Sequence, residues 1–449
     1  MLRALVSSPI YGIIPRFQPG TAGLSKQFFY SNFILPAIIM ATKIISFKNQ
    51  KMRDTLAGHT GVFERIEQQL KTRDNNKPLV WFHVASAGEY LQALPVMERL
   101  MDNDYQCALT VTSVSGYRWA SKKRDQYPKL VVLDYYPLDT QTNVNRMLDL
   151  IRPDIMVYVK FDLWPNLIWE SCKRKIPQIL ISATLHEKSK RVTSSLGKSF
   201  YGSLYQCLDQ ILTVTDDDKH RFLESCPTHK NIITVGDTRF DSVLDRKAKL
   251  AKPDLPEFIQ HKTVLILGSI WPADEQHIFP VITKAMQAFP ELFVIAAPHE
   301  TDKAHIQAIE KTFQNFSPSK FTENNLNEQN RVLIVDTVGQ LSALYAYAHI
   351  AYVGGAFSTG VHNTMEPAAM GVPAIFGPFY QNSPEAMEMV QAGKCFSIKN
   401  SAEFETLLSK LLSDSQYRIT AGESAAEYIQ TQAGASDVCF SKIKETISQ

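Results

Sequence analysis

Short apolar runs that alternate with amphipathic stretches dominate the chain from about residue 75 onward. The first run, PLVWFHVAS (78–86), is typical of a buried strand, and GEYLQALPVMERL (88–100) follows it with helical spacing. Six similar runs come next, each followed by polar or helical sequence: CALTVTSVS, KLVVLDYYP, DIMVYVKF, PQILISATL, QILTVTD and NIITVGD. Apolar runs of this length between helices indicate a parallel sheet built from βα units.

The alternation of apolar runs and helical stretches stops at 244–262. There, DLPEFIQ lies between charged flanks and predicts a linker. A second series of apolar runs then begins: KTVLILGSI, ELFVIAAP, RVLIVDT, HIAYVGGAF, VPAIFGP and KCFSIK. The pattern predicts an α/β protein with two Rossmann-like, doubly wound domains facing a cleft, a GT-B-like architecture. We expect the domains at 51–243 and 263–420, with C-terminal helices over 421–449.

The N-terminal extension, 1–50, contains an uncharged apolar run, FFYSNFILPAIIMAT, from Phe28 to Thr42. Four basic residues follow: Lys43, Lys48, Lys51 and Arg53. The run is shorter than the ~20 residues of a spanning helix, unless it continues to Phe47. A membrane anchor or interfacial helix is favoured, because basic residues suit a cytoplasmic leaflet. A buried core helix is the alternative, and a signal peptide is least favoured because no small-residue cleavage site follows a clean apolar core.

Composition narrows the class of protein. A chain of 449 residues is long enough for two domains, and its net charge of +2 argues against a dedicated nucleic-acid binder. Its six cysteines include no C-x-x-C pair, so neither a zinc site nor a disulfide framework is indicated and a reducing cytoplasm fits best. No H-E-x-x-H pair indicates a hydrolytic metal site.

The glycine-rich segment GGAFSTGVHNTMEPAAMGVPAIFGP carries the strongest chemical signal. Gly354 and Gly355 end a predicted strand and permit a ligand to approach the backbone closely. His362 and Asn363 lie where a helix begins, with Asn363 as its N-cap, and such a helix start suits a phosphate. Glu366 on the first turn can accept hydrogen bonds from ribose hydroxyls. The segment therefore predicts a nucleotide-sugar donor site; alternatively, Glu366 only complements the helix dipole.

A loop in the same domain extends the expected donor site. Thr337, Val338 and Gly339 lie in DTVGQLSALYAYAHIAYVGG, just before the glycine-rich segment, and offer backbone groups to a base. A simple turn is the alternative. Ser269 and His299, also in this domain, complete the predicted donor-binding set.

The first domain offers a candidate base at its first strand exit. Ser86 and Gly88 belong to a small-residue segment, and Glu89 opens the helix that follows. An acid at the carboxyl end of a parallel strand lies at the mouth of an interdomain crevice, where it can act as a general base. Glutamate is also favoured at helix starts for electrostatic reasons, and spacing alone does not separate the two interpretations.

Further acceptor-binding candidates lie at a second strand exit and in a basic run. Asp162, Trp164 and Asn166 belong to FDLWPNLIWE, in which a proline marks the first helical turn. Lys188 and Arg191 belong to HEKSKR, a basic patch that can receive lipid phosphates. A solvated surface is the commoner meaning of such a run.

Together these motifs resemble the Kdo transferases of lipopolysaccharide synthesis, glycosyltransferase family 30. The likeness runs from about residue 28 to the C-terminus. It is strongest in HVASAGE (83–89), DLWPNLI (162–168), DTVGQLSALYAYAHIAYVGG (336–355) and HNTMEPAAMGVPAIFGP (362–378).

The resemblance implies a transferase with no metal or other cofactor. It would move 3-deoxy-D-manno-oct-2-ulosonic acid (Kdo), with inversion, from CMP-Kdo to a glucosamine hydroxyl of a lipid A precursor. It would work at the cytoplasmic face of the inner membrane, without a nucleic-acid partner. The family's proposed base falls on Glu89, and its donor-binding asparagine and glutamate fall on Asn363 and Glu366.

Several positions depart from the family pattern, and they bear on acceptor recognition and anion binding. Lys160–Phe161–Asp162 stands where E-T-E is usual, Ser182–Ala183–Thr184 replaces N-A-R, Pro298–His299–Glu300 replaces P-R-H, and Gln340 replaces a glutamate. Two alternatives therefore stay open. One is another GT-B enzyme of envelope glycolipid synthesis. The other is a catalytically impaired relative that binds lipid or nucleotide, which the lost arginines favour and the intact Glu89 opposes.

Overall fold

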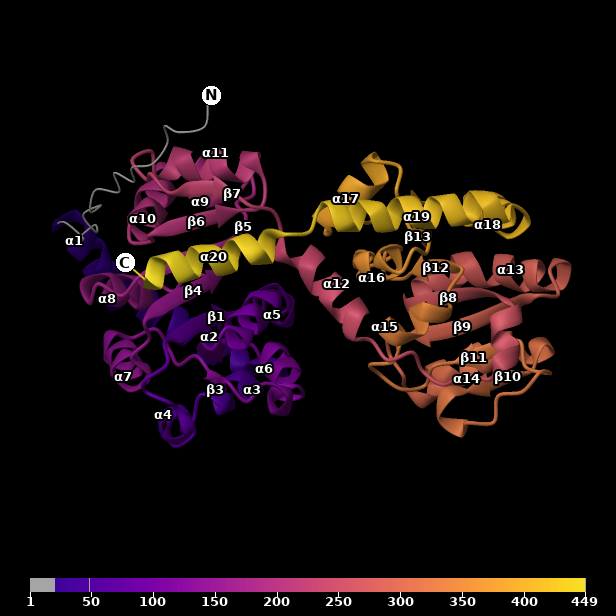
Figure 1. The fold of residues 1–449 in the computed structure, drawn as a ribbon, viewed down its shortest axis with the longest axis horizontal. Coiled ribbons are helices and arrows are strands. Elements are labelled where there is room, and N and C mark those ends of the chain that lie inside the picture. The colour runs from indigo at the N-terminus through magenta and orange to yellow at the C-terminus, as the bar shows by residue number, and fades with distance from the viewer. Residues whose placement is uncertain (1–20, 48, 449) are drawn as a thin grey trace, which may run out of the picture. The chain divides into compact units, whose positions relative to one another are not determined.

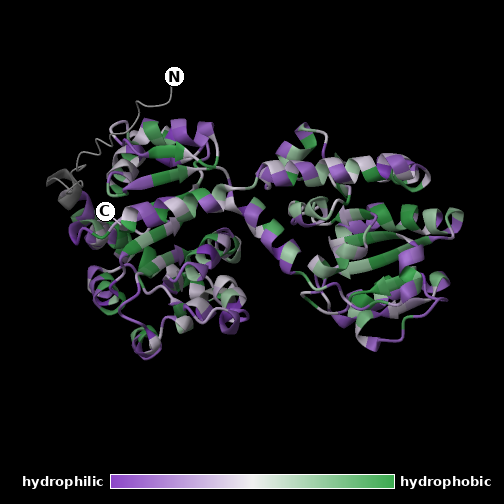
Figure 2. Ribbon diagram, viewed as in Figure 1, coloured by the Kyte–Doolittle hydropathy of each residue, from purple (hydrophilic) through white to green (hydrophobic). Residues whose placement is uncertain are grey.

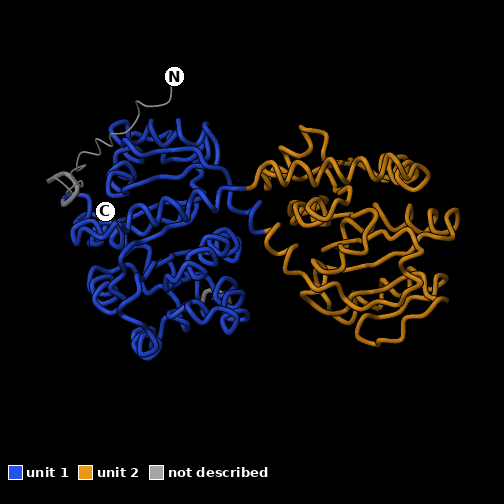
Figure 3. Tube along the Cα trace, viewed as in Figure 1, with its two compact units in different colours: residues 1–242, 434–449 blue, residues 243–433 orange. Residues whose placement is uncertain are grey.

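The computed structural model describes residues 21–47 and 49–448. The chain divides into two compact units, shown in blue and orange in Figure 3: 1–242 with 434–449, and 243–433. The chain leaves unit 1 within helix α12 (Thr238–Lys249) and returns to it before α20 (Ala435–Ile447). The predicted linker stretch contains the end of α12 and the short helix η4 (Glu257–His261).

Unit 1 is built on a seven-stranded parallel sheet with the order β3-β2-β1-β4-β5-β6-β7. Its strands are β1 Leu79–Val84, β2 Gln106–Val111, β3 Leu130–Tyr135, β4 Ile155–Val159, β5 Gln178–Ala183, β6 Gln210–Thr213 and β7 Ile232–Thr234. Six of these strands fall within apolar runs of the first series, and β2 begins one residue before its run, so this part of the prediction is confirmed.

Helices cover both faces of this sheet (Figure 1). The helices of unit 1 after the N-terminal segment are α3 Gln50–Gly58, α4 Val62–Gln69, η2 Leu70–Thr72, α5 Ala87–Asp102, α6 Val114–Ser121, η3 Arg124–Gln126, α7 Gln141–Ile151, α8 Pro165–Lys173, α9 Lys190–Thr193, α10 Ser195–Tyr205 and α11 Asp216–Ser225, with α12 and α20. Successive strand residues point to opposite faces: Trp81 packs with α7 and α8, and Phe82 packs with α5. Both faces are buried, which is why the strands are continuously apolar.

Unit 2 repeats the plan with the strand order β10-β11-β9-β8-β12-β13-β14, again parallel. Its strands are β8 Thr263–Ile270, β9 Leu292–Pro298, β10 Pro318–Lys320, β11 Val332–Ile334, β12 Ile350–Val353, β13 Ala374–Phe376 and β14 Phe396–Ser397. Strand β10 was not predicted, because its three residues carry no apolar signal. The fold class of two Rossmann-like, doubly wound α/β domains is otherwise as predicted.

The helices of unit 2 also lie on both faces of its sheet, and the strands of both sheets form the most hydrophobic layers in Figure 2. The helices of unit 2 are η4, α13 Pro272–Ala288, α14 Lys303–Thr312, η5 Gln314–Phe316, η6 Phe321–Glu323, α15 Leu341–Leu344, η7 Tyr345–Tyr347, α16 Met365–Ala369, α17 Pro384–Gln391, α18 Ser401–Ser413 and α19 Ser415–Thr431.

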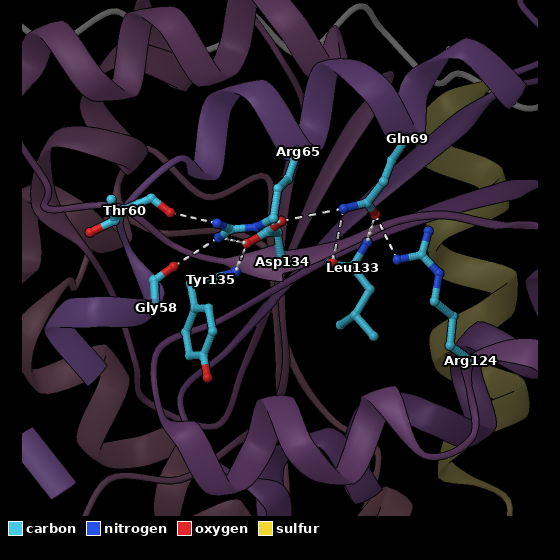
Figure 4. A network of polar contacts seen from close by, with 8 residues as sticks. All are labelled: Gly58, Thr60, Arg65, Gln69, Arg124, Leu133, Asp134 and Tyr135. Carbon is cyan, nitrogen blue, oxygen red and sulfur yellow. Dashed lines mark hydrogen bonds and ion pairs between the residues drawn. The ribbon is translucent and has the colours of Figure 1, made fainter. Parts of the chain in front are cut away.

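Helix α4 protects β3, the edge strand of the unit 1 sheet (Figure 4). Gln69 pairs with the strand backbone as a neighbouring strand would: its Oε1 accepts from Leu133 N at 2.8 Å and its Nε2 donates to Leu133 O at 3.3 Å. Arg65 meets Asp134 with two nitrogens, and Arg124 donates to Gln69 Oε1 at 2.8 Å. These contacts occupy backbone groups that would otherwise invite another strand.

The N-terminal segment forms α1 (Thr21–Phe29), the π-helical turn η1 (Tyr30–Ile34) and α2 (Leu35–Ser46). In the described part of the chain, Ser25–Ser46 is the one helix long and apolar enough to cross a membrane. The core-helix alternative is partly confirmed, because Tyr30 and Leu35 join the unit 1 core. The anchor stays a prediction, and large apolar side chains such as Phe33 are exposed.

Candidate functional site

The strand order of each sheet marks one position where ligands of doubly wound proteins bind. In unit 1 the chain winds outward in opposite directions from β1 and β4, and in unit 2 it does so from β8 and β12. Loops at the carboxyl ends of such strand pairs diverge and leave a crevice. Glu89 follows β1 and Asp162 follows β4, while Ser269 lies near the end of β8 and Gly354 directly follows β12.

Glu89 is held at the exit of β1 by a reciprocal cap. Ser86, the N-cap of α5, accepts a hydrogen bond from Glu89 N through its Oγ. The Glu89 carboxylate turns back and accepts from Ala85 N at 2.5 Å. Glu89 is buried, whereas Gly88, which precedes it in the chain, is exposed.

Burial makes Glu89 a base suited to neutral pH. Loss of hydration raises the pKa of Glu89 to about 7, against the lowering effect of the Ala85 N–H, and the negative charge of Asp162 adds to the rise. Lys160 and the Ser86 amide lower it. A carboxylate with a pKa near the operating pH accepts a proton more effectively than an ordinary glutamate.

Asp162 lies near Glu89, and two aromatic side chains lie at its carboxylate. Trp164 Nε1 donates to Asp162 Oδ2 at 3.1 Å, and Nε2 of the fully buried His83 lies 3.3 Å from the same oxygen. The other ring nitrogen of His83 is 2.9 Å from Thr110 Oγ1. The predicted residues Glu89, Asp162 and Trp164 therefore come together in unit 1.

The loop after β4 also gathers cationic side chains. Lys160 has a φ of 63°, in the left-handed region, and its Nζ lies 5.2 Å from the centre of the exposed Phe161 ring. Arg191 Nη1 donates to Phe161 O at 2.9 Å, which brings the predicted basic patch to this loop. Lys188 is exposed. The loop thus presents positive charge next to the two carboxylates.

Asn166 differs from the other acceptor candidates because it is fully buried. Its Nδ2 donates to Asp139 O at 2.6 Å, and its Oδ1 accepts from Gln27 and Ser31 of the N-terminal segment. Its amide is therefore used inside unit 1, which corrects the prediction of direct acceptor contact. Sequence reasoning missed this because it treated the N-terminal segment as separate from the domain.

In unit 2, β8 and β12 meet at their exits backbone to backbone. Gly354 N donates to Gly268 O at 2.8 Å, and a Cβ on Gly354 would lie 2.3 Å from Ser269 O. Ser269 itself has a φ of 54° at an irregularity in β8. A glycine is required here by the close approach of two backbones, while access for a ligand stays a prediction.

A stack of three rings lies at these exits. Trp271 stacks on His299 with a centroid distance of 4.4 Å, and His299 stacks on His362 at 4.6 Å. Trp271 Nε1 donates to His362 Nε2 at 2.9 Å. Burial lowers the pKa of His362, and His299 lowers it further, which keeps Nε2 free to accept that bond. The predicted His299 and His362 thus lie together, and Trp271 was missed.

The buried carboxylate of Asp274 stabilises the exits of β8 and β12. Sequence reasoning also missed this residue. It is fully buried and accepts hydrogen bonds from Trp271 N at 3.0 Å, Tyr352 Oη at 2.9 Å and Gly355 N at 2.8 Å. Its signal in the sequence was the W-P-A-D string, because an acid three residues after a helix's N-cap is typical of a capping box.

The start of α16 corrects one prediction. Thr364, not Asn363, is the N-cap, and Asn363 Oδ1 accepts from Met365 N at 3.0 Å. The helix has only five residues. Glu366 Oε1 pairs with Arg246 at 2.8 Å, a partner 120 positions earlier in the chain. Glu366 is therefore already engaged, and any ribose contact would share it with Arg246.

The loop after β11 lies along the same carboxyl edge of the unit 2 sheet. Thr337 is half-buried, Val338 and Gly339 are exposed, and Gly339 has a φ of 94°. Gly339 needs its conformational freedom here, and the loop leaves backbone groups near the surface. Among the described residues, no group of three or more His, Cys, Asp or Glu side chains is placed to hold a metal ion.

Comparisons with known proteins find relatives over most of the chain. Residues 60–242 match the family model described as 3-Deoxy-D-manno-octulosonic-acid transferase (kdotransferase). A 3-deoxy-D-manno-octulosonic acid transferase from Aquifex aeolicus is 30% identical over 342 residues, covering 76% of this chain and 87% of that protein. One from Haemophilus influenzae is 23% identical over 424 residues, covering 91% and 96%.

Solved structures show a similar fold. UDP-GlcNAc 2-epimerase from Neisseria meningitidis, bound to UDP-GlcNAc, aligns with a TM-score of 0.56 at 14% identity, over 82% of this chain and 99% of that chain. Acinetobacter baumannii MurG aligns with a TM-score of 0.51 at 11% identity, over 82% and 100%. At these identities the likeness supports the two-domain fold alone.

Proposed function

Since this chain belongs to the family of 3-deoxy-D-manno-octulosonic acid transferases, and is therefore a glycosyltransferase of lipopolysaccharide synthesis, we propose that it moves Kdo from CMP-Kdo to a lipid A precursor. The observation that carries the proposal is the Glu89 carboxylate, buried at the β1 exit with a pKa raised to about 7. An alcohol acceptor is a poor nucleophile until its proton is removed, and this group is suited to remove it.

In the proposed reaction, Glu89 takes the proton of an acceptor glucosamine hydroxyl. The oxygen attacks the anomeric carbon of Kdo as that carbon's bond to the CMP phosphate oxygen breaks. CMP leaves with the bonding electrons, and the single displacement inverts the anomeric centre. Asp162 contributes charge beside the base, while Lys160 and Arg191 lie where they can bind acceptor phosphates. No metal or other cofactor takes part.

We assign the donor to unit 2. Trp271, His299 and His362 provide ring faces and nitrogens at the β8 and β9 exits, where a base and an acidic sugar can be bound. The Thr337–Val338–Gly339 loop offers backbone groups to the base, and the Glu366 carboxylate, which also pairs with Arg246, would accept hydrogen bonds from the ribose hydroxyls. Cytidine as the nucleotide is part of the proposal.

Incubation of the purified protein with CMP-Kdo and a tetra-acylated lipid A precursor tests the function, with products identified by mass spectrometry. A product heavier by one or more Kdo units supports it. A panel of other activated sugars tests the alternative of another glycolipid glycosyltransferase. Binding of CMP without any transfer would instead favour an impaired relative.

We also propose that the protein works at the cytoplasmic face of the inner membrane. The Ser25–Ser46 helix is apolar enough to enter a bilayer, and Lys43 follows its most apolar part. Basic residues at this position are attracted to the anionic lipids of a cytoplasmic leaflet.

We expect the reaction rate to depend on ionised Glu89. The pKa of about 7 implies that kcat/KM for the acceptor is maximal above pH 7 and falls about tenfold per unit below it. A base is active when deprotonated, so the loss occurs as pH falls. A pH profile from 5.5 to 8.5 with saturating CMP-Kdo checks this, and a flat profile down to pH 5.5 contradicts it.

We expect Glu366→Ala and Asn363→Ala to weaken CMP binding, since a lost hydrogen bond at a ligand costs ~1–3 kcal/mol. Isothermal calorimetry with CMP measures the effect. Arg246→Ala serves as the control, because it breaks the same ion pair but leaves the Glu366 carboxylate in place. Unchanged CMP affinity in both Glu366→Ala and Asn363→Ala would remove them from the donor site.

A further inference from the structure

The apolar N-terminal helix packs on unit 1: α1 contacts α8 (Figure 1), and α2 contacts α3. Its side chains at positions 27, 30, 34, 35 and 39 are buried or half-buried, a stripe at helical spacing. Tyr30 and Leu35 belong to the unit 1 core, and Ile34 and Ile39 pack against it. The opposite face carries exposed apolar side chains: Phe28, Phe29, Phe33, Met40 and Ile44. One face is therefore fixed to the protein and the other is available to lipid.

Polar contacts within the buried stripe fix the rotation of this helix about its axis. Gln27 Nε2 donates to Glu170 Oε1 at 2.8 Å and to Asn166 Oδ1 at 3.1 Å. Ser31 Oγ donates to Asn166 Oδ1 at 3.0 Å, and Tyr30 Oη donates to Asp139 Oδ2 at 3.1 Å. A rotated or undocked helix would leave buried polar groups of α8 and Asp139 without these partners, which is unfavourable.

Asp139 is the centre of these contacts. It is fully buried and accepts hydrogen bonds from four donors. Besides Tyr30 Oη, these are Tyr136 Oη at 2.7 Å, Asn166 N at 2.9 Å and Leu167 N at 3.2 Å. A single carboxylate thus joins the N-terminal helix, the end of β3 and the first turn of α8.

From Asp139 the contacts lead directly to the Glu89 site. The ring of Tyr136 lies 4.7 Å from His83 and 5.7 Å from Trp164, measured between ring centres. Trp164 donates a hydrogen bond to Asp162, and His83 Nε2 lies 3.3 Å from the same carboxylate oxygen. The path from Tyr30 to the carboxylate beside Glu89 therefore runs through only Asp139, Tyr136 and these two rings.

We propose that Asp139 is a positioning residue that fixes the lipid-facing helix in one orientation relative to the wall of the acceptor site. The inference rests on the proposed function, because it assumes that the acceptor is a sugar held at a membrane surface. The reacting hydroxyl of such an acceptor lies at a set depth from the bilayer. A helix docked rigidly on the acceptor-binding unit would hold Glu89 at that depth.

The test uses the full chain with Tyr30→Phe/Ser31→Ala, which removes two docking hydrogen bonds while the Tyr30 ring keeps its contacts with Trp169 and Phe200. The acceptor is presented either in phosphatidylethanolamine–phosphatidylglycerol vesicles or dispersed in detergent. We expect KM for vesicle-embedded acceptor to rise about tenfold, the order for losing one hydrogen bond to a carboxylate. Vesicle flotation, CMP affinity and KM for dispersed acceptor should change less than twofold.

Tyr127→Phe is the matched control, because it removes a hydroxyl–carboxylate bond, to Glu98, elsewhere in unit 1. It should change none of these values. Combination of Tyr30→Phe with Tyr136→Phe should be non-additive in KM, since both hydroxyls act through Asp139. Equal rises in KM for both presentations, or no rise in either, would overturn the proposal.

Amide hydrogen exchange keeps this test separate from the proposed function. In vesicle-bound Tyr30→Phe/Ser31→Ala, exchange over 160–168 should be faster than in the unmodified protein, whether or not Kdo is transferred. Unchanged exchange there would show that the helix does not control the site wall. Failure of the unmodified protein to transfer Kdo would instead reject the proposed function.

Discussion

Glu89→Gln is expected to lower the turnover number by ~10²–10⁴, the usual effect of removing a general base. The amide keeps the size of the side chain, and its oxygen can still accept from Ala85 N. It cannot take the acceptor's proton at neutral pH. CMP affinity should stay near that of the unmodified protein, because the proposed donor residues belong to unit 2. Single-turnover kinetics with saturating acceptor and CMP-Kdo measure the change.

The matched control for this variant is Glu98→Gln, the same chemical change farther along α5. Glu98 accepts from Tyr127 Oη and has no part in the proposed reaction. It should leave turnover within about twofold of normal, as distant substitutions usually do. If Glu89→Gln retains near-normal turnover, the base lies elsewhere. Asp162 is then the next candidate, since it lies at the neighbouring strand exit with a partly exposed carboxylate.

The sequence predicts the scaffold well because each strand is a local apolar run. Six strands of unit 1 and six of the seven in unit 2 fall within predicted runs, and β2 begins one residue before its run. Parallel strands covered on both faces must be apolar throughout, so the signal does not depend on distant residues. The exception, β10, is a short edge strand with two polar residues, and only its pairing with β11 identifies it.

The candidate site is predictable where residues follow strands directly, and less so where distant segments meet. Glu89 lies on the first turn of α5, as expected from the small residues before it. Arg246 could not be found, because its pairing with Glu366 depends on how α12 packs near α16. Asn166 was given an acceptor role because nothing local shows that Gln27 and Ser31 cover it.

The N-terminal segment has one face that packs on unit 1, and its apolar composition alone does not reveal that face. Its apolar run predicts contact with lipid, and its outward face is indeed apolar. Tyr30 and Ser31 within this run, and Gln27 just before it, carry polar groups that have little use in a bilayer. Their spacing places them on one side of a helix, and this pattern was the available signal that the segment binds the protein as well.

Asp274→Ala is expected to have the largest effect on unit 2. It would leave Trp271 N, Tyr352 Oη and Gly355 N without their acceptor, and each buried donor left unsatisfied costs ~1–3 kcal/mol. We therefore expect unit 2 to lose about 3 kcal/mol or more of its free energy of unfolding. The exits of β8 and β12 should also shift, so that CMP binds at least tenfold more weakly.

Asp302→Ala is the control for this prediction, because Asp302 also caps a helix of unit 2, α14, through its carboxylate. It is exposed and accepts from a single amide, so its loss should cost ~1 kcal/mol and leave CMP affinity unchanged. Urea unfolding of the full chain followed by hydrogen exchange at β8 and β12, together with CMP calorimetry, separates the two variants. If Asp274→Ala costs no more than Asp302→Ala, the buried carboxylate does not hold the strand exits. If it destabilises unit 2 but binds CMP normally once folded, Asp274 supports the fold, and the donor lies away from the Trp271–His299–His362 stack.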